Sequence, residues 1–461
     1  MVEGFKQLRS APRGFKVSII EGALTVFGSS LIGPMVTPLL IRLGADAGVI
    51  GLYTALVSTT TPLMQILAAL ILDRFREHRL LIMTSFAGVS RILWFGVLLT
   101  ILGVWGDLWT AIALLGLSNA IGVLSSLAWT DIMADLVEAR ERGRLFAIRN
   151  TLLGLINLMS LIFAKAIYDR LMYPQGYVIA ITLGASFMLA ATPLLYLYGD
   201  QVKPKGIGLG LKGVAAAFKD RQVLKDSFSL SFWNFTVSMV GGVWNYHMYV
   251  AYGADEIWFT TLNLVAGLIG IVANPPWGSF YDRFGPRTTF ILSGLGIVAV
   301  PILFPFLPSL ASQAALQMYS TFVWSGFNLA AFNYALSYGS EARHLYIAVY
   351  NTIPSLFSAL GTLTGVQIYD RATVWVFFIS GVGRIFALTV LYQTSSSRGL
   401  AYEELKVLSN LYPIFLTTRA LAVYAYAEFI LALKLLYAAL LTVLVLSALA
   451  GLFIILKVIA L

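Results

Sequence analysis

Apolar stretches long enough to cross a lipid bilayer recur along most of this sequence. A bilayer core of about 30 Å requires about 20 apolar residues per helix, and backbone groups in lipid must form hydrogen bonds within their own segment. The pattern predicts an all-α membrane protein with twelve spans, at 17–41, 47–72, 80–103, 109–133, 148–167, 177–198, 228–252, 257–280, 288–308, 313–338, 346–368 and 373–393.

The composition supports this reading and excludes several other classes of protein. Of the 461 residues, 59% are hydrophobic and 11% are charged, whereas about a quarter of the residues in a soluble domain are charged. The chain has no cysteine, so disulfides, thiolate metal sites and cysteine nucleophiles are excluded. We also find no nucleophile–base pair, metal cluster or phosphate loop, and therefore expect no enzyme, no metal and no cofactor.

The positive charges predict the orientation of the chain. A net charge of +9 would suggest nucleic acid as the partner of a soluble protein, but these cations lie between the spans. With the N-terminus inside, the inner segments carry 22 Lys and Arg, and the outer loops only Arg42, Lys165, Arg170 and Arg371. Because inner loops are the positive ones, we expect a multi-pass cell-membrane protein with a cytoplasmic N-terminus, embedded in a lipid bilayer and without nucleic acid.

One long polar segment divides the spans six and six. It runs from Gly199 to Lys225 and carries six cations. We therefore expect a cytoplasmic N-terminus (1–16), a six-helix bundle (17–198), a cytoplasmic linker (199–227), a second six-helix bundle (228–393) and a C-terminal extension (394–461). The apolar run at the end of the extension is long enough for a thirteenth span, preceded by amphipathic segments. A re-entrant or surface-lying tail is the alternative.

Two short motifs repeat between the halves. Asp73-Arg74-Phe75 follows the second span and Asp282-Arg283-Phe284 follows the eighth, an offset of 209 residues. A second set of four residues recurs at an offset of 201, with Arg142, Ala147, Asn150 and Thr151 matching Arg343, Ala348, Asn351 and Thr352. The halves are therefore parallel repeats, an arrangement typical of transporters with a site near the bilayer midplane.

At these motifs the sequence resembles the major facilitator superfamily. That family carries a Gly-x-x-x-Asp-Arg-x-Gly-x-Arg-type motif after helices 2 and 8. The second copy here fits it with Gly278, Asp282, Arg283, Gly285 and Arg287. The first copy departs from it, since Ala69 and Arg76 replace the two glycines and Arg79 comes one residue late. The resemblance covers about 17–393 and implies two pseudo-symmetric bundles; we also expect a functional monomer.

The resemblance implies a cytoplasmic gate built on these motifs. Asp73 can accept charge-assisted hydrogen bonds, while Arg74 and Arg79 can pair with Asp131 and Asp135 at the end of the fourth span. In the family, such contacts hold the halves together when the site opens outward and break when it opens inward. The other residues expected at the gate are Arg142, Gly278, Asp282, Arg283, Gly285, Arg287 and Arg343.

The resemblance also implies that helices 1, 4, 7 and 10 line a central cavity. Small hydroxyl side chains can instead promote helix packing, whereas a carboxamide facing lipid is costly. Such a lining, polar and aromatic but poor in charge, suits a small neutral or amphipathic organic solute. The candidates on these spans are Thr25, Ser29, Ser118, Asn119, Ser125, Asn234, Ser238, Trp244, Asn245, Trp324 and Asn328.

Glu21, Arg91 and Arg384 are ionisable residues well inside the predicted spans and are candidates for function. Glu21, on the polar face of span 1, could carry a proton during transport; alternatively it is solvated or paired with Lys16. Arg91 and Arg384 lie in the middle of spans 3 and 12. For both arginines we expect hydrogen bonds to nearby helix carbonyls or hydroxyls rather than contact with a substrate.

These features favour a secondary transporter that moves a small organic solute by alternating access, with proton coupling through Glu21 as an option. A lipid flippase or scramblase is the alternative, followed by a non-transporting membrane sensor. Span 5 has no Gly-Pro pair and the core of span 4 has no arginine, in contrast to the drug antiporters of the family. Standard drug/proton antiport is therefore disfavoured.

Overall fold

The computed structural model describes residues 11–137, 139–171, 173–199, 215–216, 218–336 and 343–394. The predicted thirteenth span and the amphipathic segments before it lie outside these residues, as does most of the linker between the halves. All the regular elements within the described residues are helices.

The first half begins with a helix that is interrupted by one 3₁₀ turn. It then continues as five further helical segments, which correspond in order to predicted spans 2 to 6. The elements are α2 (Arg13–Ile32), η1 (Gly33–Met35), α3 (Val36–Arg42), α4 (Ala47–Arg74), η2 (Arg76–His78), α5 (Arg79–Ile101), α6 (Leu108–Leu136), α7 (Ala139–Arg170), α8 (Gln175–Ala191) and η3 (Thr192–Tyr198).

The second half contains α10 (Arg221–Gly241), α11 (Trp244–Ala251), α12 (Glu256–Leu303), η4 (Phe304–Phe306), α13 (Leu310–Leu336), α14 (Arg343–Arg371) and α15 (Trp375–Thr394). α12 covers two predicted spans in succession. Gly285 lies between them and breaks the helix with a φ of 78° and a ψ of 174°. A residue with a Cβ atom rarely adopts this backbone conformation. The inner glycine of the second Asp-Arg-Phe turn is therefore the residue that lets the chain reverse direction.

The predicted spans all coincide with helical segments. By length and hydropathy alone, eight helices among the described residues can cross a membrane, and Trp375–Leu391 is a shorter apolar helix. The largest difference in a boundary is at α7, which starts at Ala139 although the apolar run starts at Ile148. Arg, Glu and Leu are good helix formers, so the helix continues beyond the residues that hydropathy places in lipid.

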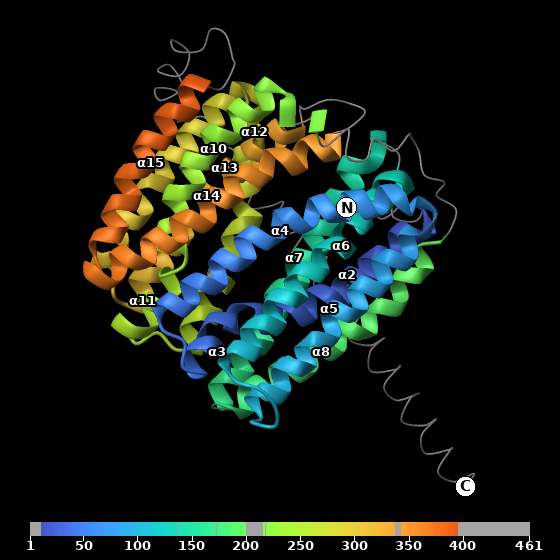
Figure 1. The fold of residues 1–461 in the computed structure, drawn as a ribbon, viewed down its shortest axis with the longest axis horizontal. Helices are drawn as coiled ribbons and strands as arrows, with labels where there is room; N and C mark the ends of the chain where they lie inside the picture. The colour runs from blue at the N-terminus through green and yellow to red at the C-terminus, as the bar shows by residue number, and fades with distance from the viewer. Residues whose placement is uncertain are drawn as a thin grey trace. The chain divides into compact units, whose positions relative to one another are not determined.

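Most helix contacts lie within one half, and the most extensive contacts between the halves involve two pairs of helices (Figure 1). α4 packs along α14, and α7 packs along α12. Glycines allow the close approach at both interfaces: a Cβ atom added to Gly51 would overlap Val366, and one added to Gly267 would overlap Leu158. The halves therefore meet mainly along α4–α14 and α7–α12, with smaller contacts of η1 with α12 and of α3 with α11.

In the second half, α10 and α14 pack closely against each other at two glycines of α14. A Cβ atom added to Gly361 would overlap the backbone of Phe235, and one added to Gly365 would overlap the backbone of Met239. The two glycines are one turn apart on the same face of α14, which is the small-xxx-small pattern of tightly packed membrane helices. The position of α14 thus depends on having glycine, which has no side chain, at these two positions.

We predict that Gly365→Ala lowers the melting temperature of the purified protein in detergent, whereas Gly270→Ala does not. Both changes improve helix propensity by about 1 kcal/mol. Nothing lies within 4 Å of a Cβ atom at Gly270, whereas a Cβ atom at Gly365 meets the backbone of Met239. Crowding in a packed interior costs about 1–3 kcal/mol. Equal melting temperatures for the two variants would contradict the close α10–α14 contact.

Candidate functional site

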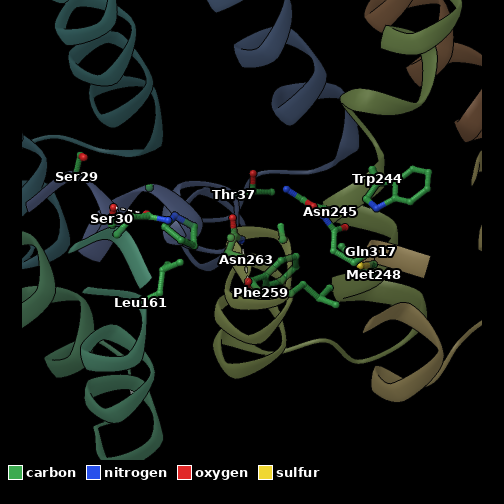
Figure 2. A pocket seen from close by; sticks show the side chains of 16 residues that line it. Ser29, Ser30, Thr37, Leu161, Trp244, Asn245, Met248, Phe259, Asn263 and Gln317 are labelled. Carbon is green, nitrogen blue, oxygen red and sulfur yellow. Dashed lines mark hydrogen bonds between the residues drawn. The ribbon is translucent and has the colours of Figure 1, made fainter. Parts of the chain in front are cut away.

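A cavity of about 600 Å³ lies between the two halves. This volume is in the range of about 300–1,000 Å³ that small-molecule sites occupy. Figure 2 shows ten of its side chains with labels. The first half contributes Ser29, Ser30, Gly33, Pro34, Thr37, Asn157 and Leu161, and the second half contributes Trp244, Asn245, Met248, Phe259, Leu262, Asn263, Ala266, Gly267 and Gln317.

The lining of the cavity is polar, and none of the described residues that form it has an ionisable side chain. It includes three asparagines and one glutamine beside the hydroxyls of Ser29, Ser30 and Thr37. Each carboxamide offers both hydrogen-bond donors and an acceptor. The cavity can therefore hydrogen-bond an uncharged solute, and the described part of its lining offers no counter-ion for a charged one.

Three of the predicted cavity residues line this cavity, namely Ser29, Trp244 and Asn245. The ring of Trp244 packs against Phe304 and Phe377, with centroids 3.8 and 5.9 Å away. Much of the ring surface is therefore used for packing, and Trp244 forms a wall of the cavity rather than a free stacking platform.

The predicted serines of α6 and α10 bond to neighbouring helices instead. Ser118 donates to the carbonyl of Ser90 at 2.7 Å and Ser125 to that of Met83 at 2.8 Å, both on α5. Ser238 shares a hydrogen bond with Ser358 of α14. These hydroxyls hold helices together, the packing role that the sequence had left open for serines and threonines.

The other predicted residues also lie outside the lining. Asn119 accepts a hydrogen bond from Thr61 of α4 at 3.0 Å. Trp324 packs against Trp233 and Phe327 with centroids 6.3 and 5.4 Å away. Asn234 is half-buried on α10 and Asn328 is exposed on α13, and neither lines the cavity.

Three carboxamides of the cavity were missed by the sequence reasoning. Asn157 lies on α7, Asn263 on α12 and Gln317 on α13. The family resemblance had directed the search to spans 1, 4, 7 and 10, so spans 5 and 8 were not searched. The cost of a carboxamide in lipid applies equally to these spans and is the signal that marks Asn157 and Asn263.

An ion pair joins the two halves one helical turn from the cavity. Arg42, at the end of α3, lies with its Nη2 atom 3.2 Å from Oε1 of Glu256, at the start of α12. The Tyr177 hydroxyl of α8 donates to the same oxygen at 2.9 Å. The Arg42 guanidinium also lies 5.8 Å from the ring centroid of Tyr249, within cation–π distance. We name Arg42, Tyr177 and Glu256 the Arg42 lock.

From the sequence alone, Arg42 was identified only as one of the few cations in the outer loops. Its partner Glu256 is 214 positions further along the chain, and its side chain is 13% exposed. No local spacing relates residues this far apart. The lock is therefore a contact that only the packing of the two halves reveals.

At the opposite end of the helices, Arg79 binds two carboxylates of α6. Its Nη1 atom is 2.7 Å from Oδ2 of Asp131 and 2.7 Å from Oδ2 of Asp135. Residues four apart face the same side of a helix, so a cation between them relieves the repulsion of the two carboxylates. The pairing suggested for Arg79 by the sequence is present, and it lies entirely within the first half.

The structure describes the other gate residues only in part. Arg74 is exposed at the end of α4, and Gly278 and Gly285 lie in α12. The remaining gate side chains fall outside the described part of the chain: Asp73, Arg142, Asp282, Arg283, Arg287 and Arg343.

Glu21 lies in a buried network inside the first half. Its carboxylate accepts hydrogen bonds from Arg91 of α5 at 3.0 Å, from Thr25 at 2.7 Å and from the Tyr198 hydroxyl of η3 at 3.3 Å. Only 4% of Glu21 is exposed, and it does not line the cavity. The structure thus pairs Glu21 with Arg91, a partner that the sequence had not suggested, and places Thr25 in this network.

The intramembrane arginines bond to helix groups as expected. Arg91 also donates to the carbonyl of Met188 at 2.7 Å and to the Thr192 hydroxyl at 2.9 Å. Arg384 donates to the carbonyl of Ile297 at 3.0 Å. Arg149, near the start of predicted span 5, is also buried, and its guanidinium lies 4.6 Å from the ring centroid of Trp129.

Comparisons with known proteins agree with this architecture. The family model of the Major Facilitator Superfamily matches residues 20–362. No curated protein sequence matches the chain. Among solved structures, a point mutant of the nucleoside transporter NupG is similar, with a TM-score of 0.63, 12% identity, and coverage of 82% of this chain and 100% of that one.

Two further solved structures share the fold at low identity. A bacterial homologue of the human lysosomal transporter Spinster, inward-facing and unoccupied, has a TM-score of 0.58 and 14% identity over 84% of this chain and 98% of its own. A bacterial homologue of the iron transporter ferroportin, outward-facing, has a TM-score of 0.57 and 18% identity over 84% of this chain and 100% of its own. The chain therefore belongs to the Major Facilitator Superfamily and is a multi-pass membrane transporter, not an enzyme.

Proposed function

We propose that this secondary transporter moves a small uncharged organic solute through the cavity by alternating access. The observation that carries the proposal is the lining itself: both halves contribute carboxamides, the first half adds three hydroxyls, and none of the described lining residues has an ionisable side chain. A site shared between two repeats can open to either side when the repeats rock against each other.

We infer that the Arg42 lock closes the outer entrance in the state seen here. Arg42 and Tyr177 belong to the first half and Glu256 to the second, so opening this entrance must separate them. The positive-inside rule places this end of the helices outside the cell. Structures of this fold have been solved both inward-facing and outward-facing, which supports such a cycle.

At the inner end, we propose that the two Asp-Arg-Phe turns form the cytoplasmic gate. Arg79 holds Asp131 and Asp135 on α6, so the first turn is attached firmly to its own half. Gly285 supplies the reversal in the second turn. The two turns would then move as parts of their halves, meeting when the cavity opens outward.

We predict that Arg42→Ala increases access to the cavity from outside. Because the chain has no cysteine, a single Met248→Cys in the cavity wall can report access through its labelling by a membrane-impermeant maleimide. Losing the ion pair removes a contact that exists only in the closed state, so labelling should become several-fold faster. The reversed pair, Arg42→Glu with Glu256→Arg, should slow labelling again.

Arg371→Ala is the matched control for this experiment, because Arg371 is an exposed cation in the last turn of α14 at the same end of the helices. The control should label at the parental rate. If Arg42→Ala and Arg371→Ala label at the same rate, the lock is not a closing contact.

Transport by reconstituted protein distinguishes a solute carrier from a lipid flippase or scramblase. We expect proteoliposomes to accumulate an uncharged organic solute, and we expect labelled lipid to stay in its original leaflet. Exchange of labelled lipid between leaflets without uptake of any solute would exclude the proposal and favour the flippase or scramblase.

For Glu21 we propose a positioning role within the first half rather than proton transfer. Three donors already bind its carboxylate, and one of them is the largely buried guanidinium of Arg91. Protonation would remove the charge that Arg91 needs in an environment where an unpaired cation is costly. The network also links α2 to α5 and η3, so it fixes the helix that continues into the cavity wall at Ser29.

We predict that Glu21→Gln lowers the melting temperature and leaves the response of uptake to an imposed pH gradient unchanged. Removing one partner of a buried ion pair costs about 3–5 kcal/mol. Glu77→Gln, at an exposed position of η2, should leave both quantities at the parental value. If uptake by the parent protein depends on the gradient and uptake by Glu21→Gln does not, Glu21 carries the proton instead.

A further inference from the structure

Two carboxamides of the cavity use one of their polar atoms in a hydrogen bond within the protein. This bond determines whether a donor or an acceptor remains for a solute. Asn263 donates from Nδ2 to the backbone carbonyl of Phe259 at 2.8 Å. A carbonyl oxygen can only accept a hydrogen bond, so this contact must use the amide nitrogen of Asn263. Its oxygen Oδ1 is therefore left as an acceptor, on a side chain that is exposed to the cavity.

Asn157 uses its oxygen, rather than its nitrogen, in a hydrogen bond within the protein. Its Oδ1 atom accepts a hydrogen bond from the Ser30 hydroxyl at 2.7 Å. The Nδ2 group then keeps its two N–H donors, and no hydrogen bond from Nδ2 to the described residues is found. Figure 2 shows Ser30 on the wall formed by the first half, and Asn263 on the wall formed by the second. Ser30 thus fixes Asn157 as a donor, as Phe259 fixes Asn263 as an acceptor.

The two asparagines belong to the two helices that meet between the halves. The Nδ2 atom of Asn157 lies 3.5 Å from the position of a Cβ atom on Gly267, which is one turn after Asn263 on α12. The donor of one half therefore lies beside the helix that carries the acceptor of the other. Both asparagines line the same cavity, so a solute held there lies between the two residues' helices.

We propose that the Asn157–Asn263 pair selects uncharged solutes with a carbonyl beside an N–H group, as in a lactam or a cyclic urea. The solute carbonyl would accept from Nδ2 of Asn157, and the solute N–H would donate to Oδ1 of Asn263. Leu161, Met248 and Phe259 would pack against the apolar part of the solute. This inference rests on the proposed transport of an uncharged solute and specifies its chemical class.

Buried polar groups make such a pair selective. A site built to satisfy both an amide donor and an amide acceptor penalises any solute that leaves one of them unpaired. An N-methylated solute keeps the carbonyl but loses the N–H, and its methyl group would point at Oδ1 of Asn263. One neutral hydrogen bond corresponds to a change in affinity of about five- to tenfold.

The test is binding of three probes to the purified full-length protein by calorimetry. The probes are an N-benzyl cyclic urea, its N′-methyl derivative and benzyl glucoside. We expect the cyclic urea to bind about five- to tenfold more tightly than the methylated form. This preference should disappear in Asn263→Leu, and in Asn157→Leu both compounds should bind more weakly.

Two further variants separate a specific role from general disruption. Ser30→Ala frees the carboxamide of Asn157 to rotate, so it should reduce the preference for the cyclic urea while the protein keeps its melting temperature. Asn150→Leu, on the same helix as Asn157 but outside the cavity lining, should leave binding of all three probes unchanged.

Equal affinities of the two urea probes would overturn the proposal, as would no binding of the cyclic urea at millimolar concentration. Tighter binding of benzyl glucoside that survives Asn263→Leu would indicate a polyol site and would also overturn it. Uptake of the glucoside by proteoliposomes would then leave the proposed transport intact. Selective binding of the cyclic urea with no uptake of any solute would instead support the pair and contradict the transport.

Discussion

The structure depends on one constraint: lipid in the hydrocarbon core offers no hydrogen-bonding partner. A polar group there must therefore find its partner inside the protein. The helices satisfy the backbone, but each polar side chain within a span must find its own acceptor or donor. Ser118 and Ser125 find backbone carbonyls of α5. Glu21 finds Arg91, Thr25 and Tyr198. Polar residues that are satisfied in this way hold helices together.

In a second group of polar residues, only some of the hydrogen-bonding atoms have a partner among the described residues. These residues face the cavity. Asn157 and Asn263 each use one end of the carboxamide on the protein and leave the other end to the cavity. The same physical cost that makes Ser118 a packing residue makes these two asparagines candidates for binding a solute. The difference lies in the partner, which the residue type does not reveal.

The two ends of the helices are stabilised by different kinds of ion pair. At one end Arg79 binds two carboxylates within the first half, so this cluster can persist whichever way the cavity opens. At the other end Arg42 binds a carboxylate of the second half, so this pair must break when its entrance opens. A transporter needs both kinds of contact, because its halves must stay rigid while the interface between them changes.

The sequence by itself determined the helical class and the family, because hydropathy and the repeated Asp-Arg-Phe turns are local patterns of residues. The twelve predicted spans coincide with helical segments, while their division six and six stays a prediction. The sequence also identified the Arg79 partners, which follow from charges at neighbouring helix ends. The locations of Asn157 and Asn263 in the cavity, the Arg42–Glu256 pair and the Glu21–Arg91 pair were decided by tertiary structure. Each joins residues on different helices, and whether a polar side chain faces a partner, a cavity or lipid depends on how those helices are rotated and packed. That rotation is set by distributed contacts such as Gly365 against Met239, which hydropathy along the chain does not encode.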